Sequence, residues 1–207
     1  MHAPIPNLFD RVEPGPRKAH KRHILGCALA CFDELGIEAT TIETIRERAS
    51  SSVGSIYHHF GNKDGLVAAL YLAALDDQFA QAEPRMLSAK TPRDAVEALV
   101  RTYLEWVTQQ PQLARFLFRA RHLVASGPFK DELAKRNKQR FETLLNQLAG
   151  GIKEGVILPL PKELFASLLI GQSENYCRAW LAQRVKAKPV LYVDIFVQAA
   201  WASVSAM

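Results

Sequence analysis

The fold is decided by residues 40–66, which read TTIETIRERASSSVGSIYHHFGNKDGL. The pattern predicts two short helices joined by a tight turn, the second running straight into a third. Thr40, followed three residues later by Glu43, predicts a capping box at the start of the first helix. Ile42 and Ile45 lie three residues apart, so this helix is expected to bury one side and expose the other.

Serines at positions 50–52 predict the turn, because serine hydroxyls compete for backbone groups and favour turns and caps over helix interiors. Ser52 is placed to cap the second helix, which is expected over residues 53–59. The Gly61-Asn62 pair ends that helix, and Asn62 or Asp64 begins the next. Two helices joined by a three-residue turn have the geometry of a DNA-reading helix-turn-helix.

This stretch resembles the DNA-binding motif of TetR-family transcriptional regulators, in which Thr-Thr and Ile precede a turn and then Gly-Ser/Thr-Ile/Leu-Tyr-x-His/Tyr-Phe-x-x-Lys-x-x-Leu. The residues that match in register are Gly54, Ser55, Ile56, Tyr57, His59, Phe60, Lys63 and Leu66. Upstream, the residues that fit the family's first helix are Arg22, Ile24, Leu25, Ala28, Phe32 and Gly36. The resemblance implies an all-α fold: an N-terminal three-helix DNA-binding domain and a larger helical domain for ligand binding and dimerisation.

The chain departs from that family pattern in one cluster. Arg46 stands where the family usually has alanine, and Ser50-Ser51-Ser52 stands in place of Gly-Val-Ser. Arg46 is therefore expected either to extend outward or to push the two helices apart. Serine in a left-handed turn position costs about 1 kcal/mol, and loss of the valine removes roughly 1.5 kcal/mol of apolar contact if that site is buried. The helix-turn-helix is expected to be looser than usual.

Length and composition favour a chain that folds in water. With 207 residues and 48% hydrophobic composition, it is long enough to bury a substantial core, in one domain or two small ones. No window approaches the roughly 18 uninterrupted apolar residues that a membrane helix needs, and no apolar run precedes a cleavage site at the N-terminus. Cys27, Cys31 and Cys177 form no disulfide framework and suit a reducing compartment. The expectation is a soluble cytoplasmic protein that does not contact membranes.

The net charge of +5 is unevenly distributed. Residues 1–65 hold eight Lys or Arg and eight Asp or Glu, and their basicity is local, in the segment RKAHKRH at residues 17–23. The basic excess lies between Arg115 and Arg140, where eight basic residues face two acidic ones. A local patch, and not the overall charge, is therefore expected to decide DNA binding.

Proline positions predict the domain boundaries. Residues 1–16 carry four prolines and no periodic pattern, which predicts a disordered arm; an arm that follows the DNA minor groove is the alternative. Residues 17–66 form the expected helix-turn-helix domain, whose last helix connects onward to about residue 82. Pro84 and Thr91-Pro92 interrupt the helical pattern, and residues 83–207 form the expected effector-binding and dimerisation domain.

The larger domain is expected to be helical throughout, since no strand pattern or repeat appears in it. Apolar positions at helical spacing predict helices over residues 92–109, 111–126, 130–148, 163–184 and 190–205. The last two are apolar over much of their circumference, which predicts burial on more than one side. In TetR-like proteins the last two helices of each subunit form a four-helix dimer interface, so the resemblance implies a homodimer, with a monomeric core as the alternative.

A recognition helix reads base edges with its N-terminal and outward side chains, while neighbouring residues hold phosphates. The candidates for base edges are Ser52, Val53, Ser55 and His58, with Gly54 allowing close backbone approach. The candidates for phosphates are Thr41, Tyr57, His58, Lys63, Arg17 and Lys21, of which Lys63 rests on the resemblance. None of the base-edge candidates is an Arg, Asn or Gln, so direct readout is expected to be modest. The alternative for Tyr57 is a core aromatic.

The resemblance also implies a small-molecule pocket in the larger domain, whose occupation changes the spacing of the two DNA-binding domains of the dimer. No shared motif identifies the pocket residues, so the candidates rest on chemistry: aromatic walls with a few polar groups. They are Trp106, Phe116, Phe118, Arg119, His122, Asn175, Tyr176 and Trp180. Arg115, Arg119 and His122 share one helical face, which either meets an acidic ligand or is simply solvated.

A zinc site on the first helix is a further alternative, since His20, His23, Cys27 and Cys31 share a helical pattern. Their span of about 16 Å along a straight helix prevents convergence on one ion. At most a pair such as His23 and Cys27 contributes ligands. No metal and no cofactor is therefore expected.

The sequence thus predicts a homodimeric DNA-binding regulator, a repressor of a palindromic operator that a small apolar or weakly acidic effector releases. One alternative is a ligand-binding helical dimer whose altered turn has weakened or lost DNA binding. A second alternative is a helical-bundle enzyme, but the sequence offers no Glu-x-x-His pair, nucleophile motif or phosphate loop. No catalytic residue is assigned, and the chain is not expected to be an enzyme.

Overall fold

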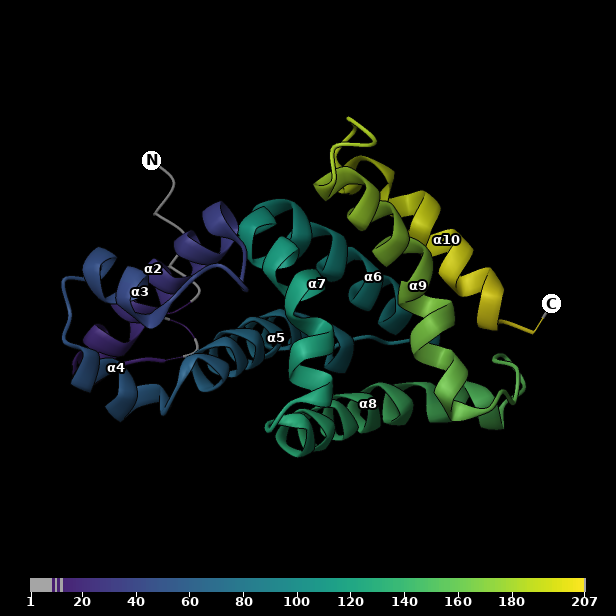
Figure 1. Cartoon of the computed structure of the whole chain (residues 1–207). Coiled ribbons are helices and arrows are strands. Elements are labelled where there is room, and N and C mark those ends of the chain that lie inside the picture. The colour runs from purple at the N-terminus through teal and green to yellow at the C-terminus, as the bar shows by residue number, and fades with distance from the viewer. Residues whose placement is uncertain (1–8, 10, 12, 207) are drawn as a thin grey trace. The chain divides into compact units, whose positions relative to one another are not determined.

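The computed structural model describes Phe9, Arg11 and residues 13–206, in which helices are joined by short connections (Figure 1). Within these residues the only β feature is an isolated antiparallel bridge between Ile157 and Ser205. The elements, with 3-10 helices marked η, are η1 (Pro16–Lys18), α2 (Ala19–Leu35), α3 (Ile42–Arg48), α4 (Val53–Phe60), α5 (Lys63–Leu87), α6 (Pro92–Gln109), α7 (Pro111–Ser126), α8 (Lys130–Lys153), α9 (Lys162–Leu181), η2 (Pro189–Tyr192) and α10 (Val193–Val204). The expected all-α fold is confirmed.

Packing divides the chain into two compact units. Unit 1 comprises residues 1–77 and 112–133, and unit 2 comprises residues 78–111 and 134–207. Unit 1 therefore contains the helix-turn-helix together with α7 from Gln112 onward, which the sequence analysis placed in the larger domain. These units are defined by packing. The functional division into a DNA-binding domain over residues 17–66 and an effector-binding and dimerisation domain over residues 83–207 stays a prediction.

The core of unit 1 forms where the apolar faces of its short helices meet. The buried side chains of α2, α3 and α4 are Ile24, Leu25, Ala28, Leu29, Cys31, Phe32, Ile45, Ile56 and Phe60. Phe32 of α2 stacks on Phe116 of α7, with ring centroids 5.6 Å apart and an interplanar angle of 14°. Beside this stack, Arg115 donates two hydrogen bonds to Asp33, each 2.9 Å long. An aromatic stack and a bidentate ion pair thus hold α7 against α2.

Two residues of the N-terminal segment contact the rest of unit 1, and the disordered arm expected over residues 1–16 stays a prediction. Phe9 is only 4% exposed, and its ring lies 3.8 Å from the position of a Cβ on Gly26. Arg11 donates to the carboxylate of Asp77 at 2.6 and 3.0 Å, and the Asp77 side chain is almost fully buried. Burial of the ring and pairing of the charge offset the conformational entropy lost at Phe9 and Arg11. Residues 1–8, 10 and 12 lie outside the described part.

Helix α5 continues through Pro84 to Leu87, although the sequence analysis placed its end near residue 82. Proline removes one backbone N–H from a helix, but Met86 in the last turn is fully buried. Ser88 N–H then donates to the Pro84 carbonyl at 3.1 Å. Burial of Met86 thus outweighs the hydrogen bond that the proline removes. The expected interruption is wrong at Pro84 and right at Thr91-Pro92, where Thr91 and Asp94 form the capping box of α6.

In unit 2, α6, α9 and α10 pack against one another. The buried side chains of these helices include Val96, Val100, Leu104, Trp106, Phe165, Leu169, Cys177, Val197, Ala200 and Val204. Helix α8 continues through Gly150 and Gly151, past the end expected at residue 148. A Cβ on Gly151 would lie 2.7 Å from the ring of Pro92, so glycine permits a close approach there. Burial raises the pKa of the Cys177 thiol to about 12, which makes it an inert core residue.

Candidate DNA-binding surface

The turn between α3 and α4 carries the first part of the surface. Ser50 takes a left-handed backbone conformation with φ of 46°, which glycine adopts most readily. Ser52 caps α4, because its side chain accepts a hydrogen bond from the Ser55 N–H at 3.1 Å. The predicted cap at Ser52 and the predicted left-handed serine are both confirmed.

Helix α3 is capped by Thr41, one residue later than expected. Thr41 Oγ1 accepts a hydrogen bond from the Thr44 N–H at 3.1 Å. Thr40 is fully buried, and its hydroxyl donates to the Gly36 carbonyl at 2.7 Å. Thr40 and Thr41 are equally good cap residues by type. Burial decides which of them caps α3, because the buried hydroxyl of Thr40 needs a partner inside the protein. Thr41 remains exposed at the start of α3, where the sequence analysis placed a phosphate contact.

Helix α4 buries Ile56 and Phe60 and turns its other side outward. Tyr57 is 49% exposed and Val53 is 39% exposed, while Gly54 and His58 are exposed as well. The core-aromatic alternative for Tyr57 is therefore wrong. These outward residues are among those that the sequence analysis assigned to DNA, and an apolar side chain at the start of α4 suits contact with a thymine methyl.

The junction of α4 and α5 fixes the position of Lys63. Gly61 ends α4 with φ of 76°, and Asn62 caps α5 by accepting the Gly65 N–H at 2.8 Å. Lys63 Nζ donates to the Glu38 carbonyl at 2.9 Å. Because an ammonium has three N–H donors, this contact leaves others for a phosphate. The phosphate role of Lys63 stays a prediction.

The basic segment at the start of α2 meets an acidic residue that the sequence analysis missed. Glu13 forms ion pairs with Lys18, at 2.7 Å, and with Lys21. Burial alone would raise the pKa of Glu13, but hydrogen bonds from Lys18 and Lys21 lower it overall. Lys21 is thus engaged within the protein, whereas Arg17 is exposed. Glu13 precedes the helix and belongs to no periodic pattern, so only the folded chain reveals the contact.

Arg46 takes the first of the two conformations expected for it. Its Nη2 lies 2.6 Å from Glu43 and 3.6 Å from Glu47, so the side chain runs outward along α3. The hydrogen bond with Glu43 raises the pKa of Arg46, which keeps the guanidinium charged. Helices α3 and α4 remain in contact, so the arginine does not separate them.

His20 of α2 reaches both the turn and the recognition helix. Its Nε2 lies 3.1 Å from the Ser51 hydroxyl and 3.0 Å from the Ser55 hydroxyl. In the sequence His20 belongs to the basic segment at residues 17–23 and to the helical pattern of possible metal ligands, and neither connects it with the turn at residues 50–52. These partners are 31 and 35 residues away in the sequence, so no local pattern brings them together.

The ligand candidates are divided between the two units. Unit 1 contains Phe116, Phe118, Arg119 and His122, and unit 2 contains Trp106, Asn175, Tyr176 and Trp180. Phe116 and Trp106 are buried in the cores of their units. Arg119 lies 4.0 Å from Asp33, and the Tyr176 hydroxyl donates to the Ala187 carbonyl at 3.0 Å. These contacts give several candidates a structural role, and their role in ligand binding stays a prediction.

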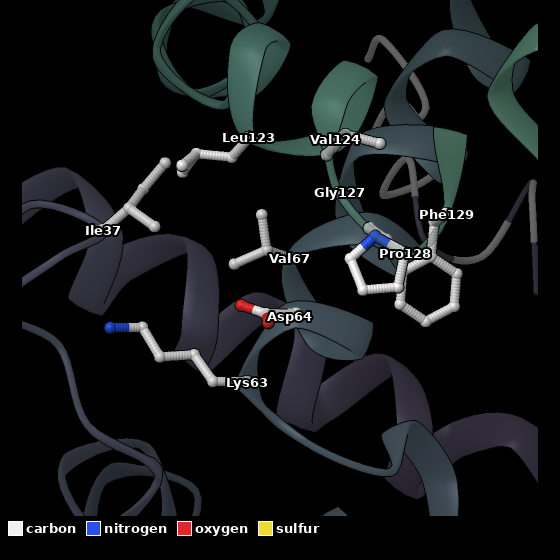
Figure 2. A pocket seen from close by; sticks show the side chains of 10 residues that line it. Ile37, Lys63, Asp64, Val67, Leu123, Val124, Gly127, Pro128 and Phe129 are labelled. Atoms are coloured by element: carbon white, nitrogen blue, oxygen red, sulfur yellow. The ribbon is translucent and has the colours of Figure 1, made fainter.

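A small cavity opens in unit 1 beside α5 and the connection between α7 and α8 (Figure 2). Its volume of about 40 Å³ holds a few water molecules, far less than the roughly 300–1,000 Å³ of a small-molecule site. It is lined by Ile37, Lys63, Asp64, Val67, Ala68, Leu123, Val124, Gly127, Pro128 and Phe129. Figure 2 shows Lys63 and Asp64 on the side of Val67 opposite Leu123. The predicted ligand residues do not line this cavity.

Neither a metal centre nor a membrane segment is found in the described part of the chain. Among those residues, no group of three or more His, Cys, Asp or Glu side chains is arranged to hold a metal ion. His23 Nε2 lies 3.8 Å from Cys27 Sγ, and burial raises the pKa of this thiol. No described helix is both long and apolar enough to cross a membrane.

Comparisons with known proteins agree with this geometry. Residues 24–70 match the model of bacterial regulatory proteins of the tetR family. The HTH-type transcriptional repressor KstR2 of Mycobacterium tuberculosis is 32% identical over 152 residues, which cover 73% of this chain and 75% of KstR2.

Two solved structures share the fold. A TetR family transcription regulator from Marinobacter aquaeolei has a TM-score of 0.78 at 20% identity and covers 92% of this chain and 98% of its own. FadR from Bacillus subtilis, in complex with stearoyl-CoA, has a TM-score of 0.75 at 16% identity, covering 88% and 98%. The exposed recognition helix, the matched residues and the identity with KstR2 lead to one conclusion: this chain belongs to the TetR family of bacterial regulatory proteins.

Proposed function

We propose that this chain is a repressor that binds a palindromic DNA operator as a homodimer and is released by a small-molecule effector. The observation that carries the proposal is the outward face of α4, where Val53, Gly54, Tyr57 and His58 are exposed just after a capped turn. An exposed Tyr and Val beside polar residues suit a surface that contacts a partner. KstR2 is named as a repressor, which supports this direction of control.

Base reading is assigned to the N-terminal end of α4 and phosphate binding to its surroundings. The base-reading residues are Ser52, Val53, Gly54, Ser55 and His58. The phosphate-binding residues are Thr41, Tyr57, His58, Lys63, Arg17 and Lys21. Because Lys21 is paired with Glu13, it exchanges this carboxylate for a phosphate when DNA binds.

The second subunit is proposed to pack on α9 and α10. On these helices, Leu164 is 42% exposed and Ile195 is 64% exposed, and Leu191 of η2 is 70% exposed. Apolar side chains this open on neighbouring elements of one unit are costly in a monomer and typical of an interface. Two subunits related by a twofold axis present two recognition helices, which is why the operator is expected to be palindromic.

The effector is proposed to be a small apolar or weakly acidic molecule bound within residues 83–207. FadR from Bacillus subtilis shares the fold and is in complex with stearoyl-CoA, which supports an effector with an apolar body. Such a ligand releases DNA only if it binds better to a dimer whose DNA-binding domains have the wrong spacing. Because the DNA of a bacterial cell lies in the cytoplasm, the protein is proposed to act there.

A ligand-binding dimer without DNA binding is the second candidate, and the left-handed Ser50 is the observation that favours it. A strained turn weakens a DNA-reading surface if it shifts the start of α4. The enzyme alternative is set aside because the chain belongs to a family of regulators.

Selection from a pool of random DNA duplexes tests the proposal. The protein is expected to enrich a palindrome, and DNase footprinting is expected to show protection that is lost as salt is raised. Tyr57→Ala is expected to lower affinity for that duplex about tenfold or more, since a hydrogen bond to a charged group and an apolar contact are lost together. Tyr57→Phe removes only the hydroxyl and should weaken binding less. If no palindrome is enriched at low salt, the ligand-binding dimer is the better account.

A further inference from the structure

The turn of the helix-turn-helix is held by a side chain from outside it. His20 Nε2 lies 3.1 Å from Ser51 Oγ in the turn and 3.0 Å from Ser55 Oγ in α4. Ser51 stands where TetR-like sequences usually have valine, so a polar contact replaces an apolar one. We propose that His20 is a positioning residue of the DNA-reading surface, which anchors the turn at Ser51 and orients the Ser55 hydroxyl toward DNA. This inference rests on the proposed function.

The position of Ser55 makes its orientation matter. Ser55 lies in the first turn of α4, the end of a recognition helix that contacts base edges. Its backbone N–H is already fixed by the cap at Ser52, at 3.1 Å. An unrestrained serine side chain samples three staggered rotamers, and the contact with His20 favours one of them. Both the backbone and the hydroxyl of Ser55 are therefore held before DNA arrives, which reduces the entropy lost on binding.

The imidazole also sets what Ser55 offers to a base. The ring Nε2 carries either one proton or one lone pair in the ring plane. With the proton on Nε2, His20 donates and the Ser55 O–H remains to donate to a guanine or thymine acceptor. With the proton on Nδ1, Nε2 accepts the Ser55 proton, and the serine oxygen is left to accept from adenine or cytosine. In both forms His20 restricts which base edge Ser55 reads.

The ring of His20 has a neutral neighbour. Its centroid lies 6.0 Å from that of His59, and His59 in turn packs edge-on against His58 at 5.3 Å. Burial lowers the pKa of His59, and the nearby His58, His20 and Lys21 lower it further. His59 therefore stays uncharged at neutral pH and packs beside His20 without repelling it.

A double-mutant cycle tests this inference on the duplex that the wild-type protein selects from random DNA. His20→Phe keeps a ring of similar size and removes both nitrogens. It is expected to weaken binding by about threefold to tenfold, the effect of one hydrogen bond. In a Ser55→Ala background the same change is expected to have a smaller effect, because only the contact between His20 and Ser51 is then left to lose.

Base discrimination and the salt dependence of binding distinguish a positioning role of His20 from a direct contact with DNA. His20→Phe is expected to lose discrimination at one symmetric base pair in each half-site, while the slope of affinity against salt stays unchanged because no phosphate contact is lost. His20→Gln restores an N–H donor and is expected to recover part of the affinity. His23→Phe is the matched control, since His23 is also exposed and lies one turn along α2; it should bind as the wild type does.

Equal binding by His20→Phe and the wild type, or losses that multiply with those of Ser55→Ala, would overturn the role of His20. A salt slope reduced by about 1 would also overturn it, since His20 would then be a phosphate contact. The Tm of each variant is measured by thermal melting. If His20→Phe is less stable than the wild type, base discrimination is measured with Ser55→Ala instead. If the wild-type protein selects no duplex, the proposed function itself is wrong. If the wild-type protein selects a duplex and His20→Phe selects and binds it equally well, only the role of His20 is wrong.

Discussion

Ser50 holds a backbone conformation that favours glycine, at the point where α3 gives way to the turn. Its φ of 46° lies in the left-handed region, where an L side chain costs about 1 kcal/mol or more. Neighbouring contacts keep it there: Ser51 N–H donates to the Arg46 carbonyl at 3.1 Å, and Ser52 caps α4. The turn thus keeps a helix-turn-helix geometry by bearing strain at one residue.

Ser50→Gly is expected to raise the free energy of unfolding by about 0.5–1 kcal/mol, because relief of the left-handed strain exceeds the extra chain entropy of glycine. Thermal melting should show a correspondingly higher Tm. Ser52→Gly is the control in the same turn, since its φ of −91° brings no strain and the change removes a cap. A lower Tm for Ser50→Gly would mean that its side chain stabilises the turn.

Lys63→Ala is expected to weaken binding to all DNA sequences alike and to lower the slope of log affinity against log salt by about 0.9, the value for one phosphate contact. The physical reason is the loss of an ammonium that still has donors beyond its bond to the Glu38 carbonyl. Filter binding at several salt concentrations measures the slope, and Lys90→Ala in unit 2 serves as the control. If the slope stays unchanged while Tm falls, the role of Lys63 is structural.

At the scale of the element, α2 is the helix to which other parts of unit 1 attach. Near its C-terminal end, Asp33 accepts two hydrogen bonds from Arg115 of α7. Near its N-terminal end, Glu13 pairs with Lys18, just before the helix, and with Lys21. The first pair joins residues that are remote in the sequence, and the second involves a residue that precedes the helix. Both neutralise charges within unit 1.

Stability should depend on pH through Asp33. The hydrogen bonds from Arg115 lower the pKa of Asp33 below its ordinary 3.8. A carboxyl with a lowered folded pKa stabilises the fold above its unfolded pKa, and this contribution is lost as pH falls through the folded value. Asp33→Asn should therefore cost about 1 kcal/mol at neutral pH and little in strong acid, as measured by urea unfolding. Glu34→Gln, in an exposed pair with Arg48, should change stability little at either pH.

Glu13→Gln is expected to strengthen DNA binding by about twofold to fivefold, because Lys18 and Lys21 no longer have to leave a carboxylate. The salt slope should change little, because Lys21 reaches a phosphate in the wild-type complex as well. Glu163→Gln, exposed on α9, changes the net charge equally and should leave both quantities unchanged. Unaltered affinity in Glu13→Gln would show that these lysines lie away from the DNA.

The elements were predictable from the sequence wherever the controlling contacts are local. Helix periodicity, the cap at Ser52 and the left-handed residue at Ser50 all depend on neighbours within a turn or two. The errors arose where burial or distant residues decide: Thr40 is buried and leaves the cap to Thr41. Pro84 is carried inside α5 although proline weakens a helix. In the same way, Glu13 and His20 reach the candidate DNA-binding surface through contacts that no spacing rule anticipates.

At the scale of the whole molecule, α9 and α10 present two stripes with the same spacing. On α9 the stripe consists of Leu164, Leu168, Gly171 and Asn175, and on η2 and α10 it consists of Leu191, Ile195, Gln198 and Ala202. Alternating steps of four and three residues are the pattern of helices that pack lengthwise. The side chains opposite these stripes, such as Cys177 and Val197, are buried within unit 2. The stripes are therefore outward faces that suit a second copy of the chain.

Ile195→Glu is expected to convert the proposed dimer to a monomer, because Ile195 is 64% exposed in the single chain and a carboxylate buried at a dimer interface lacks a partner. Light scattering during size-exclusion chromatography measures the mass. Leu87→Glu is the matched control, since Leu87 is 57% exposed at the end of α5 and should leave the mass unchanged. Affinity for the selected palindrome should fall when dimerisation is lost, since two linked recognition helices bind more tightly than one. A dimer that persists in Ile195→Glu would place the interface elsewhere.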